Sequence, residues 1–191
     1  MSAFEVHGGK QLSGSIVPQG AKNEALQIIS AVLLTKDAVV INNIPDILDV
    51  NLLIELLQDL GVKVNRLDRH TCVFQADNVN IDYLNTEDFR KKGSRLRGSV
   101  MIAGPMLARF KKASIPKPGG DKIGRRGVDT HVIGFQKLGA DFHYNTQTYC
   151  LEFTTSGLKG TYMMLDEPSV TGTANIVMAA VMAKGKTEIY K

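Results

Sequence analysis

Helix and strand signals recur along this chain at a long period, and the repetition limits the folds that it can adopt. An apolar helix is predicted over 24–34, then a strand over 38–41, then an amphipathic helix over 49–60 that ends at Leu60-Gly61. The same order returns after residue 95 and leads to Leu138-Gly139, 78 residues after the first Leu-Gly pair. The sequence therefore predicts structural repeats that are longer than those of short solenoid proteins.

A third copy of this pattern begins near the end of the chain. Residues 169–175 open an apolar helix that continues to Ala183, and a strand is predicted over 187–190. This copy lacks the amphipathic helix and the Leu-Gly strand that close the first two. Three buried helices alternating with amphipathic helices and strands predict an α/β domain of repeated units, with the third repeat incomplete. We expect the 191 residues to be part of a longer protein.

Local signals predict where several elements begin or end. Phe4–Val6 and Ser15–Val17 have the composition of short strands around a Gly-Gly turn. Asp49 is predicted to cap the second helix, and Asp129 to begin the helix that precedes Leu138-Gly139. Pro105 is predicted to bend or interrupt the apolar helix over 95–109, because proline removes a helical hydrogen bond.

The composition is typical of a soluble globular protein that needs no bound metal. Hydrophobic residues make up 43% of the chain, which is enough for one core, and no apolar run is long enough to span a membrane. The start of the chain lacks the features of a signal peptide, so we expect a cytoplasmic protein. Cys72 and Cys150 each lie in a strand-like run and are predicted to be buried, reduced thiols. The four histidines show no metal-ligand spacing, and we expect neither a metal nor a cofactor.

The positive charge of the chain is concentrated in one region. Residues 90–126 hold 12 of the 23 basic residues and a single acid, Asp121, whereas the rest of the chain has 11 basic and 18 acidic residues. The formal net charge of +4 is therefore a local feature. Such a concentration predicts an anionic ligand at one place on the molecule.

Within this region, residues 116–131 are predicted to form a functional loop. Two prolines and four glycines disfavour both helix and strand, and five charged side chains lie between the first proline and the last glycine. Helix N-termini flank the loop and are predicted to converge at 20–23, 95–98, 124–129 and 169–172. Because helix N-termini carry free N–H groups and a partial positive charge, this convergence suits a phosphate or carboxylate.

Three basic side chains at these helix starts are candidates for binding the anion. Arg97 and Arg126 can bind it through two parallel hydrogen bonds, and Lys22 can act as a point charge. Taken alone, Lys22 is better explained as an ordinary surface lysine, whereas Arg97 fits a salt bridge on a helix face as well as it fits a binding role. The three together are less easily explained as surface charges.

Nucleic acid is the main alternative ligand for a basic region. Residues 90–126 contain one aromatic residue, Phe110, so they offer no stacking platform for bases, and no nucleic-acid-binding signature is visible. The chain also lacks a Gly-x-x-x-x-Gly-Lys-Ser/Thr loop, so nucleotide hydrolysis has no support. We therefore predict a small phosphorylated ligand, and neither a nucleic acid nor a membrane as a partner.

Five motifs together resemble those of one enzyme family. In order and spacing, Gly20–Asn23, Leu96–Ser99, Gly104–Phe110, Pro118–Asp129 and Ser169-Val170 are similar to the enolpyruvyl transferases that act on UDP-N-acetylglucosamine. The resemblance covers essentially the whole chain. The related shikimate-pathway enolpyruvyl transferase shares the fold, but the Pro-Gly-Gly loop and the Arg-x-Val-Asp turn resemble the amino-sugar enzymes more closely.

The resemblance implies a fold and a domain organisation. Members of this family have two inside-out α/β domains, each built from three repeated units with buried helices, and the active site lies between the domains. Residues 1–20 would then be a strand segment of the first domain, and residues 21–191 the loop-bearing domain, truncated at its C-terminal end. The C-terminal half of the same enzyme, with an aspartate base and a further arginine, would be the partner of this chain.

The resemblance also implies a reaction. The family transfers the enolpyruvyl group of phosphoenolpyruvate to the 3-hydroxyl of UDP-N-acetylglucosamine and releases phosphate, the first committed step of peptidoglycan synthesis. Lys22 and Arg126 would hold phosphoenolpyruvate, with Asn23 beside Lys22. The remaining substrate-binding residues would hold the uridine diphosphate sugar, and they are Arg97, Gly127, Val128, Asp129, Thr130, Ser169 and Val170, together with Arg126.

Asp121 stands where the family most often has a cysteine that reacts with the epoxide antibiotic fosfomycin. A carboxylate can replace this thiol as a proton donor if a nearby phosphate raises its pKa, because like charge disfavours ionisation. It cannot supply a thiolate to an epoxide. We therefore predict that Asp121 is catalytic and that the parent enzyme resists fosfomycin; a solvated turn residue is the alternative reading.

Two further departures from the family concern binding residues. Gly127 replaces a usual proline and makes the turn less rigid, and Glu167-Pro168 replace residues that include a lysine near the nucleotide. The role of that lysine is not transferred to Glu167. Two other functions remain open at this point, a catalytically silent fragment that binds the sugar nucleotide and the shikimate-pathway enzyme.

Overall fold

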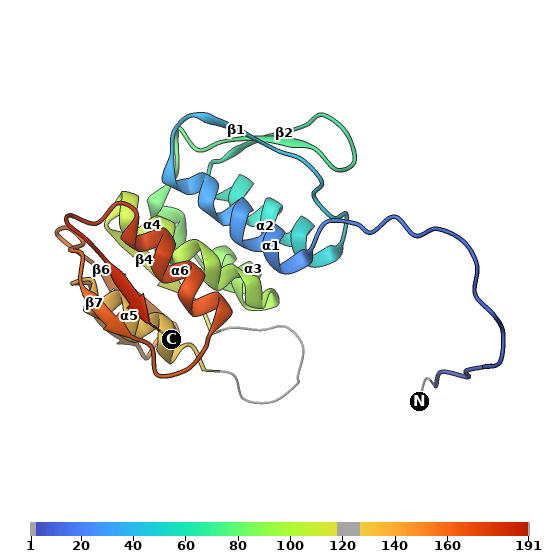
Figure 1. Cartoon of the computed structure of the whole chain (residues 1–191). Coiled ribbons are helices and arrows are strands. Elements are labelled where there is room, and N and C mark those ends of the chain that lie inside the picture. The colour runs from blue at the N-terminus through green and yellow to red at the C-terminus, as the bar shows by residue number, and fades with distance from the viewer. Residues whose placement is uncertain (1–2, 118–126, 191) are drawn as a thin grey trace.

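The computed structural model describes residues 3–117 and 127–190. The helices in chain order are α1 (Lys22–Ala31), η1 (Val32–Leu34), α2 (Leu48–Asp59), η2 (Ile81–Asn85), α3 (Glu87–Arg95), η3 (Arg97–Ile102), α4 (Ala103–Phe110), α5 (Asp129–Lys137) and α6 (Val170–Ala180). The strands are β1 (Ala38–Ile41), β2 (Lys63–Arg66), β3 (Cys72–Gln75), β4 (Lys112–Ile115), β5 (Asp141–Asn145), β6 (Cys150–Thr154), β7 (Tyr162–Met164) and β8 (Glu188–Tyr190). Figure 1 shows the helices gathered between the sheets, which lie on the outside.

The first two repeats form equivalent three-stranded sheets. In the first unit, residues 22–76, the strand order is β1-β3-β2, and in the second unit, residues 97–155, it is β4-β6-β5, with every pair antiparallel. Phe74 and Phe153 occupy equivalent positions on the central strands and are fully buried. The predicted repeat is therefore confirmed at the level of strand order and core position.

The two amphipathic helices also end in the same way. Gly61 and Gly139 follow α2 and α5 with φ angles of 96° and 90°, a conformation that glycine adopts without steric cost. In the first unit Gly61 N–H donates to Gln58 and Val62 N–H donates to Leu57; the second unit repeats both bonds. This pair of bonds turns the chain from helix to strand, which explains why the Leu-Gly signal predicted both helix ends.

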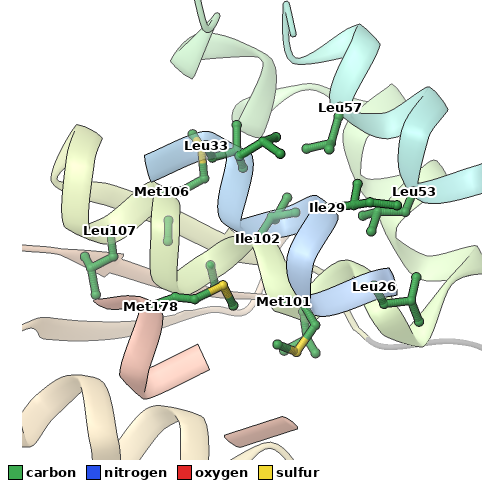
Figure 2. Packing of buried hydrophobic residues seen from close by; sticks show 14 of the residues in the cluster. Leu26, Ile29, Leu33, Leu53, Leu57, Met101, Ile102, Met106, Leu107 and Met178 are labelled. Atoms are coloured by element: carbon green, nitrogen blue, oxygen red, sulfur yellow. The ribbon is translucent and has the colours of Figure 1, made fainter. Parts of the chain in front are cut away.

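The core lies between the helices rather than between the sheets. Leu26, Ile29 and Leu33 of the first apolar stretch are buried together with Leu53 and Leu57 of α2, and Figure 2 shows Ile29 beside Leu53. On the other side, the side chains of η3, α4 and α6 close the cluster, and they include Met101, Ile102, Met106, Leu107 and Met178. All of these residues are buried, so α1, α4 and α6 form the inner helices of an inside-out α/β arrangement.

The third repeat contributes only part of a unit to the described chain. It consists of α6 and β8, and β8 pairs in parallel with β7 to form a two-stranded sheet. Val177 on α6, Val181 at its C-cap and Ile28 on the neighbouring α1 are all about half exposed or more. No helix within residues 3–117 or 127–190 covers this face, in agreement with an incomplete third repeat.

The strands predicted over Phe4–Val6 and Ser15–Val17 are absent. Residues 3–20 form neither helix nor strand, and Phe4 and Ile16 are almost fully exposed. Figure 1 shows this segment running away from the body of the molecule. The strand prediction was wrong for this chain because a strand needs a partner for its hydrogen bonds, and no described segment pairs with residues 3–20.

The helix predicted over 95–109 is divided differently from the prediction. The break comes at Leu96, which is extended and separates α3 from η3, and a 3-10 segment then precedes α4. Pro105 lies in the first turn of α4, and α4 continues unbroken from Ala103 to Phe110. The interruption predicted at Pro105 is therefore absent.

The capping role predicted for Asp49 is also wrong, because α2 begins at Leu48 and its N-cap is Ile47. Asp49 lies in the first turn, where a carboxylate is still favoured by the helix dipole. The predictions for the two cysteines are confirmed, since Cys72 and Cys150 are both free and buried.

Candidate active site

A cleft of about 980 Å³ opens where several helices begin. It is lined by the start of α1, the first turn of α2, most of residues 95–100, Gly127, and the segment 167–171 that enters α6. Of the eleven predicted site residues, six line this cleft, and they are Lys22, Asn23, Arg97, Gly127, Ser169 and Val170. Residues from all three repeats thus meet at one opening.

The other predicted site residues are placed differently. Val128, Asp129 and Thr130 directly follow Gly127 and form the start of α5, but they are not part of the cleft wall. Asp121 and Arg126 lie outside the described residues. The geometry described here therefore concerns the cleft without these two side chains.

Lys22 stands at the first position of α1. Its N-cap, Ala21, provides no side-chain hydrogen bond, so the first N–H groups of α1 are left for a ligand or for water. The ammonium of Lys22 forms an ion pair with the carboxylate of Asp49, the residue that lines the cleft from α2. The helix start and the lysine together place positive charge on this side of the cleft.

Arg97 joins two separate parts of the cleft wall. Its Nη2 donates to the backbone carbonyl of Gly127 at 3.1 Å, across 30 positions in the sequence. The guanidinium therefore bridges the start of η3 and the segment that leads into α5. Its charge also acts on His131, the third residue of α5, and lowers the pKa of that imidazole further than burial alone.

Ser169 and Thr130 organise the third side of the cleft. The Ser169 side chain caps α6 by accepting a hydrogen bond from Gly172 N–H at 3.1 Å. The Thr130 hydroxyl is buried and donates to the Glu167 carboxylate at 3.2 Å. Glu167 itself lines the cleft and presents a carboxylate there, so it cannot act as a cationic nucleotide ligand.

The charges in the cleft wall nearly balance within the described residues. Three cations, Lys22, Arg95 and Arg97, face two carboxylates, Asp49 and Glu167. Sequence reasoning missed Asp49 as a site residue, because its pairing with Lys22 joins positions 27 residues apart and no local pattern marks it. Arg95 was noticed only as part of the basic region, and the helix end that directs it to the cleft could not be predicted.

A second hollow, of about 620 Å³, lies on the first unit and has a different character. Three of its polar side chains are joined by hydrogen bonds, because Asn51 donates to Asp46 and Arg66 donates to Asn51. Arg69, outside the lining, also donates to Asp46. The Asn51 and Arg69 hydrogen bonds lower the pKa of the Asp46 carboxyl. Because these groups already satisfy one another, the cleft at the helix starts is the better candidate site.

Neither a metal centre nor a membrane span is found in the part of the chain that the structure describes. No three His, Cys, Asp or Glu residues there are grouped so that they could hold a metal ion. No described helix combines the length and the apolar character that crossing a bilayer requires.

Comparison with known proteins agrees with the geometry. Residues 6–191 match the family of EPSP synthase (3-phosphoshikimate 1-carboxyvinyltransferase). The chain belongs to the EPSP synthase family. The match covers the cleft and both complete repeats, so the resemblance inferred from five short motifs is confirmed at the level of the family.

Several curated relatives of this chain carry the same enzyme name. The UDP-N-acetylglucosamine 1-carboxyvinyltransferase of Porphyromonas gingivalis is 61% identical over 190 residues, which is 100% of this chain and 44% of that protein. The enzyme of the same name from Bacteroides fragilis is 62% identical over the same share of both chains. The one from Bradyrhizobium diazoefficiens is 44% identical over 96% of this chain and 41% of that protein. The chain thus spans less than half the length of these relatives.

Solved structures confirm the enolpyruvyl transferase fold. The enolpyruvyl transferase NikO from Streptomyces tendae superposes with a TM-score of 0.75 at 16% identity, over 96% of this chain and 42% of that chain. EPSP synthase from Acinetobacter baumannii gives a TM-score of 0.65 at 14% identity, over 92% of this chain and 40% of that chain. The predicted α/β fold of repeated units with buried helices is therefore confirmed.

Proposed function

We propose that this chain is the N-terminal portion of a UDP-N-acetylglucosamine 1-carboxyvinyltransferase. The complete enzyme would transfer the enolpyruvyl group of phosphoenolpyruvate to the 3-hydroxyl of UDP-N-acetylglucosamine and release phosphate. The reaction would take place in the cytoplasm and supply peptidoglycan synthesis. Residues 1–20 would belong to the first domain of that enzyme, and residues 21–191 would form the loop-bearing domain.

The observation that carries this proposal is the convergence of six family-motif residues on one cleft. They come from segments as far apart as Lys22 and Val170, yet they line the same opening. The chain is 61% and 62% identical to two enzymes of this name, and both alignments cover the whole chain. The similarity therefore includes every segment of the cleft wall. A chance basic surface would not require residues from three repeats to meet.

The cleft supports a division between the two substrates. Lys22 and Asn23, at the open start of α1, suit the phosphate of phosphoenolpyruvate, together with Arg126. Arg97, Ser169 and Val170 line the same cleft from other segments of the chain and would hold the uridine diphosphate sugar. Guanidinium and helix-start N–H groups favour such anions because both present several donors at once.

The chemistry needs this positive charge at each stage. The sugar 3-hydroxyl gives its proton to a base as its oxygen bonds to the enol carbon of phosphoenolpyruvate. The methylene carbon gains a proton from the proton donor, which gives a tetrahedral intermediate. The bond from that carbon to the phosphate oxygen then breaks, phosphate leaves, and the methyl carbon loses a proton. Fixed cations stabilise the phosphate and carboxylate charges throughout, and in a water-poor cleft they do so more strongly than solvent would.

Asp121 would be the proton donor in this scheme. The adjacent phosphate of the substrate would raise the pKa of the carboxyl and keep it protonated for the addition step. Since a carboxyl group offers no thiolate, the enzyme would be resistant to fosfomycin. This proposal concerns a residue outside the described part of the chain and depends on its chemistry alone.

A binding fragment without activity is the second candidate for the 191-residue chain itself. The chain spans 44% of its relatives, and the part of the cleft that faces Lys22 and Arg97 would come from the remaining length. Under this reading the chain binds the sugar nucleotide weakly and releases no phosphate. The candidates differ in activity but share the ligand.

One titration and one assay test the proposal. Isothermal titration of the 191-residue chain with UDP-N-acetylglucosamine should show binding, and shikimate 3-phosphate should not compete. Phosphate release with phosphoenolpyruvate and UDP-N-acetylglucosamine is expected only from a polypeptide that is as long as the curated relatives. Binding of shikimate 3-phosphate in place of the sugar nucleotide would assign the chain to the shikimate-pathway enzyme and refute the proposal.

A further inference from the structure

A buried polar cluster joins four helices, η3, α4, α5 and α6, next to the cleft. Asn175 of α6 is fully buried, and His131 of α5 is 2% exposed. The Asn175 side chain accepts a hydrogen bond from Gly104 N–H at 2.7 Å and donates to the Val100 carbonyl at 2.8 Å, so it binds both α4 and η3. It also lies 2.9 Å from Nδ1 of His131. We call these four residues the Asn175 cluster.

The bonds of the Asn175 cluster determine the protonation of its histidine. The Gly104 atom in this contact is the backbone nitrogen, which can only donate, so the atom that faces it must be the Asn175 amide oxygen. The amide nitrogen therefore faces both Val100 and His131 Nδ1, and since it is a donor, Nδ1 must be the acceptor. His131 is thus neutral and carries its proton on Nε2, which points toward the Thr171 hydroxyl at 3.5 Å.

Close packing prevents the helices from sliding past this cluster. A side chain at Gly104 would place its Cβ 2.2 Å from the backbone oxygen of Asn175 and 2.5 Å from its amide oxygen. The backbones of α4 and α6 therefore touch at the point where the hydrogen bonds form. A change in the cluster must shift the helices themselves, because no flexible side chain can absorb it.

One member of the Asn175 cluster and one neighbouring residue belong to the cleft wall. Val100, whose carbonyl accepts from Asn175, lines the cleft, and so does Thr171, which faces His131 Nε2. Val100 is three positions after Arg97 in η3, and Thr171 is two positions after Ser169. The cluster thus holds from below the two segments that carry the proposed sugar-nucleotide ligands.

We propose that His131 and Asn175 are positioning residues that set the spacing between Arg97 and Ser169 for the sugar nucleotide. This proposal rests on the proposed function for the identity of the ligand. Neither side chain lines the cleft, so both act through Val100 and Thr171. The Lys22 side of the cleft is built on α1, outside the cluster, and its affinity for phosphate should not depend on these residues.

Burial and the cation Arg97 favour the neutral form of His131 that the cluster needs. Burial lowers the pKa of the imidazole to about 4, and the positive charge of Arg97 on η3 acts in the same direction. From the entry to α6, Glu167 faces the neighbouring Thr130 and bonds to its hydroxyl. The imidazole therefore stays neutral near pH 7, so the same arrangement is present under ordinary assay conditions.

Three variants of the 191-residue chain separate positioning from stability. His131→Leu removes the acceptor for Asn175, whereas His131→Asn keeps an acceptor near the position of Nδ1 and should rescue. Thr155→Val is the matched control, because Thr155 is also buried and hydrogen-bonded, donating to the Gly139 carbonyl at 3.2 Å, but lies outside the cleft. Circular dichroism and thermal unfolding identify any variant that fails to fold.

We expect His131→Leu to raise the Kd for UDP-N-acetylglucosamine about tenfold, while His131→Asn and Thr155→Val stay within about threefold of the parent. The affinity for inorganic phosphate should not change in any of them. An unchanged Kd for UDP-N-acetylglucosamine in a folded His131→Leu chain would overturn the proposal. So would an equal loss in Thr155→Val.

If the parent chain does not bind UDP-N-acetylglucosamine, the proposed function is refuted but the positioning role is still open to test. Nuclear magnetic resonance then tests that role without a ligand. Imidazole ¹⁵N shifts should show a neutral Nε2–H tautomer at pH 7. Amide shifts of Gly98 and Gly172 should move in His131→Leu and stay in place in His131→Asn. A different tautomer, or unmoved amides in His131→Leu, would show that the cluster does not position the cleft wall.

Discussion

The ammonium of Lys22 is paired with the carboxylate of Asp49 at the mouth of the cleft. The two side chains are 45% and 36% exposed, and they come from the first turns of two different helices. An anion that binds Lys22 must therefore share it with a carboxylate or displace that carboxylate. A doubly charged phosphate can do so more readily than a singly charged ion, since its attraction to the ammonium is larger.

Replacing Asp49 should strengthen phosphate binding. Asp49→Asn removes the competing charge but keeps a similar shape, and a half-exposed ion pair contributes little, so we expect the Kd for phosphoenolpyruvate to fall by about two- to fivefold. Isothermal titration measures this change. Asp77→Asn is the matched control, because Asp77 forms a similar exposed pair with Lys63 at 2.7 Å but does not line the cleft. Weaker binding in Asp49→Asn would mean that Asp49 orients Lys22 instead of competing for it.

The stability of the chain should depend on the protonation of His131. Its pKa is about 4 in the folded chain and near 6.5 when it is exposed on unfolding, so the unfolded state binds more protons between these values. The stabilisation is complete above about pH 6.5 and is lost as the pH falls toward 4. We expect the free energy of unfolding to lose about 2–3 kcal/mol from this group between pH 7 and pH 4.5. Urea unfolding at several pH values measures it.

His131→Asn provides the reference for this pH dependence. The variant has no imidazole, so its unfolding free energy should change less over the same range, and the difference between the two curves isolates the group. Parallel curves for the parent and His131→Asn would contradict a depressed pKa. Several carboxylates with lowered pKa values also stabilise the folded chain, and they lose this contribution to the free energy of unfolding at lower pH. The loss is the same in both proteins, and these carboxylates include Asp46, Asp77 and Asp88.

Arg109 connects the two complete units, and its removal should destabilise the chain. Its Nη1 donates to the carbonyls of Leu33, Thr35 and Ala76 at 2.8–3.0 Å, and its guanidinium lies 4.8 Å from the ring centre of Phe110. Arg109→Met would leave three carbonyls of the first unit without this donor. We expect a loss of about 2–3 kcal/mol in the free energy of unfolding, measured with urea at pH 7.

Arg69→Met is a suitable comparison for Arg109→Met. Arg69 forms an exposed ion pair with Asp46 at 2.9 Å, and exposed pairs of this kind contribute about 0–1 kcal/mol. Equal losses in the two variants would show that Arg109 acts only as a surface charge. A larger loss in Arg109→Met, without any change in the cooperativity of unfolding, would show that the two units unfold together.

Fosfomycin should not modify the parent chain and should modify one variant. The epoxide requires a thiolate, and the only cysteines, Cys72 and Cys150, are buried, with burial raising the pKa of the Cys72 thiol. Asp121→Cys introduces the thiol that the family most often has. Intact mass spectrometry in the presence of UDP-N-acetylglucosamine should detect one adduct in that variant and none in the parent. An adduct in the parent chain would refute the prediction of resistance.

The parts of the fold that could be predicted from the sequence are those marked by local chemistry. Gly61 and Gly139 marked helix ends because only glycine adopts their backbone angles readily, and Ser169 marked the start of α6 because its hydroxyl caps the helix. The period between these signals then predicted the repeated units. The resemblance to the family then indicated that the five motifs belong to one active site.

The parts that could not be predicted depend on contacts between distant positions. The pairing of Lys22 with Asp49 and the bonds of Asn175 to Val100 and Gly104 join segments up to 75 residues apart. Nothing in the local sequence of Asn175 distinguishes it from a helix residue that faces solvent. The strand signals near Phe4 failed for the opposite reason, because a local pattern cannot form a strand without a partner.

Gly104 should tolerate no side chain, because α4 and α6 touch at this position. A Cβ there would lie 2.2 Å from a backbone oxygen of Asn175, so Gly104→Ala must separate the helices and weaken the bond from Gly104 N–H to Asn175. We expect a loss of about 2–4 kcal/mol in the free energy of unfolding, measured by urea denaturation. Gly157→Ala is the matched control, since a Cβ at Gly157 would meet no atom within 4 Å. If Gly104→Ala is as stable as Gly157→Ala, the two helices are not in fixed contact, and the Asn175 cluster cannot transmit a change to the cleft.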